Sequence, residues 1–256
     1  MTSSVLVLKV GGRLLQQSEA LSALLQVCQR IQQQRPLLLV HGGGEQIEHW
    51  LQQFQFSSTK VDGQRVTPAA HIPVIAGALA GDLNSQLVAV AQQAGLNAVG
   101  LTLAAGASIR CQIDHSRGCV GIPEAADKHL LETLLAQGFT PIMASLAQAA
   151  DGQRLNVNAD LAAAAVARLV DGDLVLLTDV DGILDKQGRL IDTINSQQAQ
   201  QLIADGTVVG GMRVKLDAAL SAAQHSRRSI AVAGWQHASN LLRLANGEQS
   251  GTRIQF

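Results

Sequence analysis

The chain has 256 residues, of which 47% are hydrophobic and 15% charged, and its formal net charge is −1. This length and composition predict a large buried core, arranged as one α/β domain or as two lobes around a cleft. A net charge near zero and an aromatic content of 2% provide neither a basic surface nor a platform for stacked bases. Proteins that bind nucleic acids or anionic membranes are therefore disfavoured.

The cysteines and the N-terminus indicate the cellular compartment. Cys28, Cys111 and Cys119 form no CxxC motif and cannot pair completely, which favours buried thiols in a reducing environment. A pairing of Cys111 with Cys119 across a hairpin remains open. The chain has no basic segment ahead of an apolar run and no stretch of about 18 uncharged apolar residues. We therefore expect a soluble cytoplasmic protein.

Short apolar runs alternate with helical periodicities along the chain. The apolar runs predict buried strands at 5–10, 37–40, 98–101, 141–144, 174–178, 230–233 and 252–254. The helical spacings predict helices capped by Ser18, from about Glu45, over 72–90 and 130–135, from near Asn158 to 165, and over 196–204 and 211–226. Residues 60–66 and 106–122 are expected to form hairpins. The alternation predicts a doubly wound α/β sandwich whose softest boundary lies at 145–157.

A lysine and two glycines end the first predicted strand. Lys9 is the only charge in an apolar run, and Gly11-Gly12 follows it. Ligands bind at the carboxyl ends of strands in open α/β sheets, and glycines let backbone N–H groups approach phosphate oxygens. Because a buried ammonium needs an anionic partner, this segment predicts a phosphate site. The alternative is a lysine that extends along the sheet edge into solvent.

The sequence His41-Gly42-Gly43-Gly44-Glu45 ends the second strand and opens a helix. The free N–H groups and the dipole at a helix start favour an anion, and a plain turn would need only one glycine. The segment also resembles the oxyanion loop of lipases and esterases, but the chain lacks their G-x-S-x-G motif. His41 either takes part in function or only fixes the turn.

Two further segments combine polar residues with a helix start. Lys215 follows Gly210-Gly211, and the helical positions four residues away hold no carboxylate, so either a phosphate or solvent neutralises it. Asn156, Asn158 and Asp160 cluster at a strand-to-helix junction, where capping accounts for one of them.

Residues 176–184 resemble the nucleophile loop of haloacid-dehalogenase phosphatases. No later strand ends in the paired acids that would hold magnesium, and the spacing does not fit an EF-hand. The P-loop pattern and the protein-kinase motifs are also absent. A nucleotide would have to be held in another way.

In this order, the motifs resemble the amino acid kinase family over essentially the whole chain. The segments that carry the resemblance are Lys9–Gly12, His41–Gly44, Gly63–Thr67, Ala76–Leu79, Asn156–Asp160, Thr178–Leu184, Gly211–Lys215 and Gly251–Ile254. The resemblance implies a three-layer α/β/α sandwich with a mainly parallel central sheet. It implies a single domain over 1–256, with an acyl-amino-acid lobe at about 1–150 and an ATP lobe at about 151–256.

Within the family, the chain is most similar to members that use ATP to phosphorylate the side-chain carboxylate of N-acetyl-L-glutamate in arginine biosynthesis. The product would be N-acetylglutamyl 5-phosphate. Two alternatives remain: a member acting on another small acid, and a catalytically silent sensor of acylated amino acids. Arginine-inhibited members carry a helix ahead of the first strand, so the resemblance implies an arginine-insensitive homodimer. Arg13 departs from the small or apolar residue expected after Gly11-Gly12, and its role is open.

The resemblance also implies residue roles. The catalytic residues would be Lys9 and Lys215, which stabilise the moving phosphoryl, and Asp160, which orients them. The acceptor would contact Gly43, Gly44, Arg65, Asn156 and Asn158. The nucleotide would contact Gly11, Gly12, Asp179, Val180, Asp181, Gly182, Ile183, Leu184, Thr207, Val208, Val209 and Gly211. Magnesium would arrive with ATP, and no protein metal ligands are expected. A carboxylate acceptor is ionised at pH 7, so the transfer needs charge neutralisation and positioning and no general base.

Overall fold

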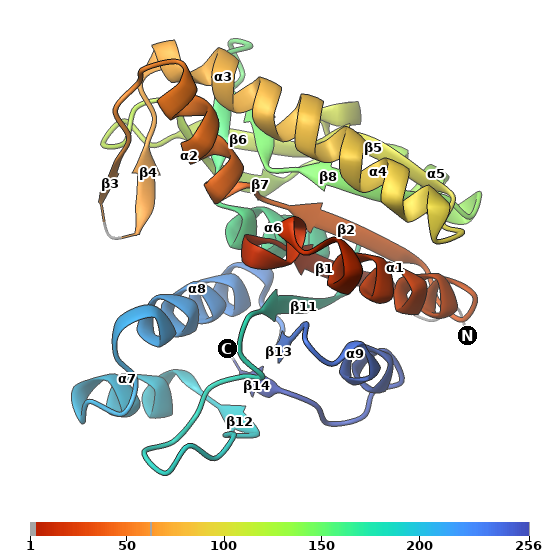
Figure 1. The fold of residues 1–256 in the computed structure, drawn as a ribbon, viewed down its shortest axis with the longest axis vertical. Helices are drawn as coiled ribbons and strands as arrows, with labels where there is room; N and C mark the ends of the chain where they lie inside the picture. The colour runs from red at the N-terminus through yellow and green to blue at the C-terminus, as the bar shows by residue number, and fades with distance from the viewer. Residues whose placement is uncertain (1–3, 62, 256) are drawn as a thin grey trace.

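The computed structural model describes residues 4–61 and 63–255, and its main feature is an eight-stranded sheet (Figure 1). The strand order is β12-β14-β13-β11-β1-β2-β8-β5. The strands are β1 (Leu6–Val10), β2 (Leu37–His41), β5 (Ala98–Thr102), β8 (Thr140–Ala144), β11 (Asp173–Thr178), β12 (Thr193–Ile194), β13 (Ile230–Gly234) and β14 (Thr252–Ile254). Neighbouring strands are parallel except β13 and β14, so the predicted mainly parallel sheet is confirmed.

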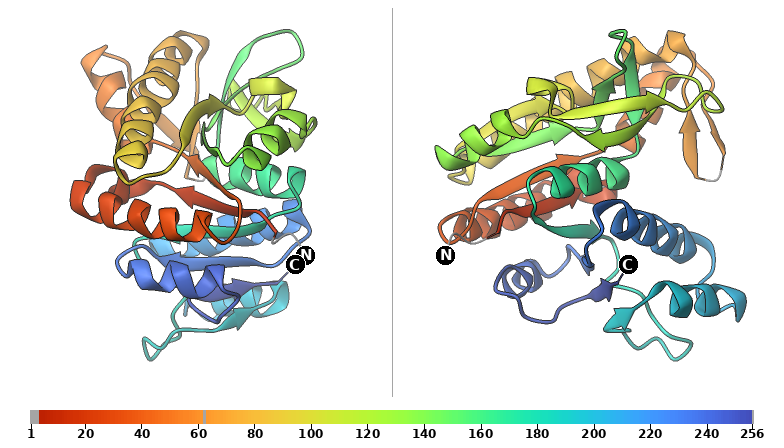
Figure 2. Two further views of the ribbon diagram at one scale, coloured as in Figure 1. Left: turned by 90° about the vertical axis from the view of Figure 1, so that its right-hand side faces the viewer. Right: turned by 180° about the vertical axis from the view of Figure 1, so that it is seen from behind.

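Helices cover both faces of this sheet (Figure 2, left). One face packs against α1 (Ser18–Gln32), α4 (Asn84–Gln93) and α9 (Ala238–Ala245). The other packs against α5 (His129–Ala136), α6 (Ala159–Leu169), α7 (Ser196–Ala204) and α8 (Gly210–Ser226). In β1, Leu6 and Leu8 join the α1 side while Val7 joins the α6 side, which explains the continuous apolar run of this strand. The predicted three-layer sandwich is confirmed.

The remaining elements lie around the carboxyl ends of the strands. They are the 3₁₀ turns η1 (Gly12–Gln16), η2 (Ala69–His71) and η4 (Ala105–Ala107), α2 (Gly44–Gln53), the β3 (Thr59–Val61) and β4 (Gln64–Val66) hairpin, and α3 (Ile72–Ala76), which continues through the π-helical η3 (Gly77–Leu83) into α4. The predicted hairpin at 60–66 is confirmed, and its Asp62 lies outside the described residues.

The hairpin predicted at 106–122 is present, and it forms part of a second sheet. β6 (Ile109–Ile113) and β7 (Val120–Ala125) pair antiparallel, but they continue into β10 (Arg154–Val157) and β9 (Leu146–Gln148). Cys111 lies opposite Pro123 and Cys119 precedes β7, so the possible Cys111–Cys119 pairing is wrong, and both thiols are free. Burial, together with the charge of Glu124, raises the pKa of Cys111 to about 12.

Helix α1 begins differently from the prediction. Ser18 is its first helical residue rather than its cap, and Gln17 occupies the cap position without a side-chain hydrogen bond. The N–H of Gln17 donates to the carbonyl of Leu14 in η1, so the chain enters the helix from a preceding 3₁₀ turn. The short α9 was not predicted.

The helical run Ala69–Gln93 is long and apolar enough to cross a membrane by length and composition. Its apolar residues are accounted for by packing, because Ile75, Leu79 and Leu87 are buried in the core of the described structure. Core helices of folded domains meet the same criterion, so the run is weak support for a membrane span.

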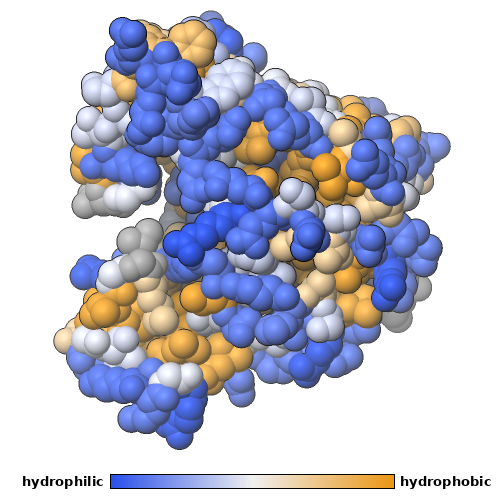
Figure 3. All heavy atoms as spheres, in the orientation of Figure 1, coloured by the Kyte–Doolittle hydropathy of each residue, from blue (hydrophilic) through white to orange (hydrophobic). Residues whose placement is uncertain are grey.

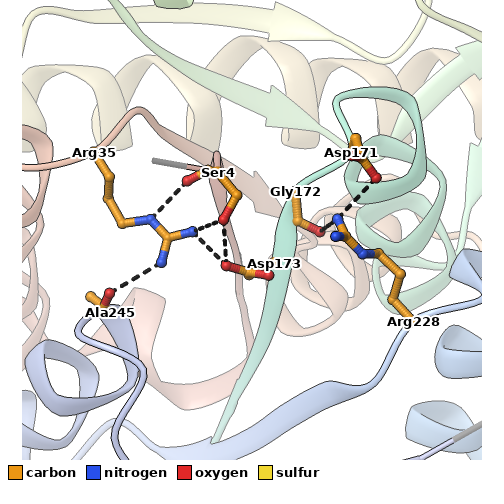
Figure 4. Close-up of polar contacts among 7 residues, drawn as sticks. All are labelled: Ser4, Arg35, Asp171, Gly172, Asp173, Arg228 and Ala245. Atoms are coloured by element: carbon orange, nitrogen blue, oxygen red, sulfur yellow. Dashed lines mark hydrogen bonds and ion pairs between the residues drawn. The ribbon is translucent and has the colours of Figure 1, made fainter. Parts of the chain in front are cut away.

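A polar cluster ties the amino ends of the strands together (Figure 4). Arg35 donates to the carbonyl and hydroxyl of Ser4, to the Asp173 carboxylate at 2.6 Å, and to the carbonyl of Ala245 at the end of α9. Burial alone would raise the pKa of Asp173, but the hydrogen bonds from Arg35 and Ser4 lower it below its usual value. This anchor lies at the sheet edge opposite the strand ends that carry the glycine motifs.

Candidate functional site

The carboxyl ends of β1, β2, β11 and β13 meet along one edge of the sheet. β1 is central, with β2 on one side and β11 on the other, so the chain reverses its direction of strand addition beside β1. Crevices for ligands open at such points in α/β sheets. Among the cavities that open here, two are lined by the predicted acceptor-binding and catalytic residues.

The first, called the lysine cavity, has a volume of about 350 Å³. Its lining comprises Lys9, Gly11, Gly12, Arg13, Glu45, Asp160, Leu176, Leu177, Thr178, Asp179, Lys215, Val232 and Trp235. The Lys9 ammonium lies 3.0 Å from the Asp160 carboxylate, and Lys215 forms an ion pair with Asp179. The structure therefore brings together the two lysines that the sequence places near opposite ends of the chain.

The partner of Lys215 differs from what its helical neighbours suggest. Asp179 follows β11 and reaches Lys215 from outside α8, a contact that helical spacing could not reveal. Burial, followed by the positive charges of Lys9 and Arg13, lowers the pKa of Lys215. Lys9, Arg13 and Lys215 thus lie close together in a lining that also holds the carboxylates of Glu45, Asp160 and Asp179.

The second, called the glycine-loop cavity, has a volume of about 190 Å³. Its lining comprises Gly42, Gly43, Gly44, Ile47, Lys60, Gly63, Gln64, Arg65, Val120, Ser145, Asn156, Val157, Asn158 and Ala159. All five residues predicted to bind the acceptor are among them. In the space-filling view the molecule is hollowed on this side, between the β3–β4 hairpin and α8 (Figure 3).

Arg65 joins the hairpin to the start of α2. Its guanidinium donates to the Glu48 carboxylate at 2.8 Å, to the Ser58 hydroxyl, and to the carbonyl of Gly44 at 3.1 Å. Burial would raise the pKa of Glu48, but the hydrogen bond and charge of Arg65 lower it. The guanidinium is therefore held in place at the cavity wall before any ligand binds.

The two cavities adjoin at the start of α6. Asn158 is the helix cap, and its side-chain oxygen accepts from the N–H groups of Asp160 and Leu161. Capping therefore explains Asn158, whereas Asn156 donates to the Thr67 hydroxyl at 3.1 Å. Asn158 lines the glycine-loop cavity and Asp160 lines the lysine cavity, so ligands in the two cavities would meet at this turn.

His41 is fully buried and lines neither cavity. Asn84 donates to its Nε2 from 3.0 Å, which leaves Nδ1 to donate to the carbonyl of Gly42. Burial lowers the pKa of His41 to about 4, although the contact with Gly42 opposes the shift. The geometry favours the turn-fixing role for this residue.

The neutral His41 makes stability depend on pH. In the unfolded chain the imidazole takes up a proton below about pH 6.5, whereas in the folded protein it stays neutral down to about pH 4. Stability is therefore present above pH 6.5 and lost as the pH falls from 6.5 to 4. Between pH 7 and 5 we expect the wild-type unfolding free energy to fall by about 2 kcal/mol more than that of His41→Gln. Urea titrations at both pH values measure this difference, and parallel curves for the two proteins would contradict it.

Gly43 and Gly44 offer a matched pair for testing the loop. A Cβ at Gly43 would lie 2.7 Å from Leu83 Cδ2 and 2.8 Å from Leu79 Cδ2, whereas a Cβ at Gly44 meets nothing within 4 Å. We expect Gly43→Ala to lower the unfolding free energy by about 1–3 kcal/mol, as overpacking does, and Gly44→Ala to leave it nearly unchanged. Urea denaturation of both variants measures this difference, and equal unfolding free energies for Gly43→Ala and Gly44→Ala would contradict the prediction.

The residues predicted to face the nucleotide are placed unevenly. Gly11, Gly12 and Asp179 line the lysine cavity. Val180, Asp181, Gly182 and Leu184 follow β11 outside its lining, and Thr207 lies outside it near the start of α8, whereas the surroundings of Gly211 are not among those described. Ile183 and Val208 are buried in the core, whereas Val209 is 63% exposed. A nucleotide role for these residues stays a prediction.

Several lining residues were not singled out in the sequence. Ser145 and Trp235 follow β8 and β13, and a polar or aromatic residue at the carboxyl end of a buried strand is the signal that could have identified them. Lys60 lies opposite Arg65 in the hairpin register.

Comparison with known proteins agrees with this arrangement. The model of the amino acid kinase family matches residues 4–234. The chain belongs to the amino acid kinase family. Acetylglutamate kinase of Shewanella pealeana is 45% identical over 98% of this chain and 95% of its own length, and that of Colwellia psychrerythraea is 43% identical over 98% and 96%. The family resemblance inferred from the motifs is confirmed.

A solved structure supports the fold as well. The protein smu.665 from Streptococcus mutans UA159 aligns with a TM-score of 0.80 and 27% identity, covering 98% of both chains. Carbamate kinase from Giardia lamblia, at 18% identity and a TM-score of 0.70, shares the fold alone.

Proposed function

We propose that this family member transfers the γ-phosphoryl of ATP to the side-chain carboxylate of N-acetyl-L-glutamate and forms N-acetylglutamyl 5-phosphate, a step of arginine biosynthesis. The observation that carries the proposal is the pair of adjoining cavities, one lined by three cations and one by an anchored arginine. Full-length similarity to two acetylglutamate kinases supports this choice of acceptor.

The glycine-loop cavity suits the acceptor. N-acetyl-L-glutamate carries two carboxylates, both ionised at pH 7. Arg65 offers a planar fork to the carboxylate that does not react, and Lys60 adds a positive charge across the hairpin. The amides of Asn156 and Asn158 provide polar contacts at the other wall. This grip would direct the side-chain carboxylate toward the start of α6.

The lysine cavity suits the donor. Lys9 and Lys215 would neutralise the nucleotide phosphates, and the Gly11-Gly12 turn would offer backbone donors. Asp160 and Asp179 hold the two lysines while phosphates are absent. Among the described residues no group of three or more His, Cys, Asp or Glu could hold a metal ion, so magnesium would enter on the phosphates as part of the MgATP substrate.

The transfer itself needs no general base. The attacking oxygen is already an anion, and the difficulty is to bring it to an anionic phosphoryl group in line with the leaving oxygen. Cations on the donor side and a fixed acceptor carboxylate address both requirements. The absence of His41 from either lining fits such a mechanism.

A substrate panel tests the proposal. Purified protein with MgATP is assayed for ADP release and for acyl phosphate, trapped as the hydroxamate, with N-acetyl-L-glutamate, L-glutamate, L-aspartate and carbamate. We expect turnover with N-acetyl-L-glutamate alone. Turnover only with another acid would replace the acceptor, and tight binding of both ligands without ADP release would indicate a sensor.

Assembly and location complete the proposal. We expect a cytoplasmic homodimer, on the basis of the family resemblance. Light scattering after gel filtration should give twice the 26.9 kDa of the chain. A mass equal to the single chain would contradict the dimer.

A further inference from the structure

Arg13 is the lining residue whose role the family resemblance leaves open. It lies on η1, directly after β1 and the Gly11-Gly12 turn, and its side chain is exposed at the lysine cavity. The Lys9 ammonium sits over the same turn, since a Cβ at Gly11 would lie 3.2 Å from Lys9 Nζ. Arg13 therefore adds a third cation to a small space.

The lining holds three cations, Lys9, Arg13 and Lys215, and three carboxylates, Glu45, Asp160 and Asp179. Lys9 is paired with Asp160 and Lys215 with Asp179. Within the part of the chain that the structure describes, none of the ion pairs found within 4.0 Å includes Arg13. The guanidinium, which offers five N–H donors, is thus available to a ligand.

The position of Arg13 relates it to the reacting end of a nucleotide. Gly12, its neighbour, lines a further hollow together with Gly43, Gly44 and Glu45. Gly43 and Gly44 also line the glycine-loop cavity. The η1 turn consequently lies between the two cavities, where a phosphoryl group would cross from donor to acceptor.

The gathering of like charges points to the kind of ligand. The positive charges of Lys9 and Arg13 are both close enough to Lys215 to lower its pKa, after the larger effect of burial. The three cations lie close together, two of them held by aspartates, and a ligand with several negative charges could contact all three. Arginine binds phosphate oxygens through two parallel hydrogen bonds, a geometry that lysine cannot offer.

We propose that Arg13 binds the terminal phosphate of the nucleotide as a third cation beside Lys9 and Lys215. The inference rests on the proposed kinase function and extends it, because it makes Arg13 a residue that distinguishes a nucleoside triphosphate from the diphosphate product. The diphosphate lacks the terminal phosphate that Arg13 would contact, so only the triphosphate gains affinity from this guanidinium.

Nucleotide binding measured by calorimetry tests this role without requiring turnover. Wild type, Arg13→Ala and Arg13→Lys are titrated with magnesium and either the non-hydrolysable ATP analogue AMP-PNP or ADP. We expect Arg13→Ala to bind AMP-PNP about tenfold more weakly and ADP within about twofold of wild type, with Arg13→Lys intermediate. Arg30→Ala, an exposed arginine on α1, is the control and should match wild type for both ligands.

The outcomes separate the two proposals. Wild-type affinity for AMP-PNP in Arg13→Ala would overturn the role of Arg13 and leave the kinase function intact. Equal weakening for AMP-PNP and ADP would overturn the assignment to the terminal phosphate. Failure of the wild type to bind AMP-PNP would overturn both. A melting temperature of Arg13→Ala equal to that of Arg30→Ala assigns a loss of affinity to the missing guanidinium, and Arg13→Gln provides a second variant if the alanine protein is unstable.

Discussion

Replacement of Lys215 by alanine is expected to lower kcat by about two to three orders of magnitude. One preorganised charge contact to the group that develops charge in the transition state is worth roughly 3–4 kcal/mol. Lys215 lines the lysine cavity, and the positive charges of Lys9 and Arg13 are close enough to lower the pKa of Lys215. The KM for N-acetyl-L-glutamate should change little, because Lys215 does not line the glycine-loop cavity.

The matched control is Lys128→Ala. Lys128 also forms an ion pair with a carboxylate, that of Glu132 on α5, but it is exposed and lies outside both cavity linings. Steady-state kinetics of both variants and their melting temperatures separate a catalytic loss from a loss of folding. An undiminished kcat in Lys215→Ala would remove Lys215 from the mechanism.

Replacement of Arg65 by alanine should act mainly on the acceptor. We expect the KM for N-acetyl-L-glutamate to rise by about a hundredfold with kcat within about threefold of wild type, because a buried bidentate grip contributes similarly to the ground and transition states. Arg65 is only 9% exposed, and its guanidinium also ties the hairpin to Glu48 and to the start of α2. Its removal therefore loosens the cavity wall as well as the grip.

Two comparisons separate these contributions. Arg65→Lys keeps the charge and loses the planar fork, so an intermediate KM would indicate carboxylate recognition. Arg243→Ala removes an exposed arginine that is paired with Glu248 and lines neither cavity, and it should leave both kinetic constants unchanged. A fall in kcat as large as the rise in KM in Arg65→Ala would contradict a binding role.

The sheet could be predicted because each buried strand is a short apolar run between helices. Strand β14 agreed with the prediction residue for residue, and β13 differed by one residue. The second sheet could not be predicted, since β9 and β10 are three and four residues long, and the pairing of β10 with β7 joins segments far apart in the chain. These two strands are too short to show an apolar pattern that predicts a strand.

The site was predicted at the level of its glycines and lysines, but not in its pairings. The motifs placed Lys9, Asp160 and Lys215 together, and the structure gathers all three in one lining. The Asp179–Lys215 pair joins the end of a strand to a distant helix, which no local spacing encodes. The sequence also suggested a nucleotide contact for Ile183, a side chain that the fold buries completely.

Helix α6 is buried in the core along most of its length and begins at the turn where the two cavities adjoin. Ala162, Ala163 and Ala164 are fully buried, so the helix packs closely against its neighbours and leaves no room for a larger side chain at these positions. An added methyl group anywhere along this surface has to be accommodated by moving the helix as a rigid rod. Its first turn carries both Asn158 and Asp160, so donor and acceptor would fall out of alignment together. Inactivating substitutions should therefore be found well away from any ligand, in a helix whose sequence looks permissive because it is mostly alanine.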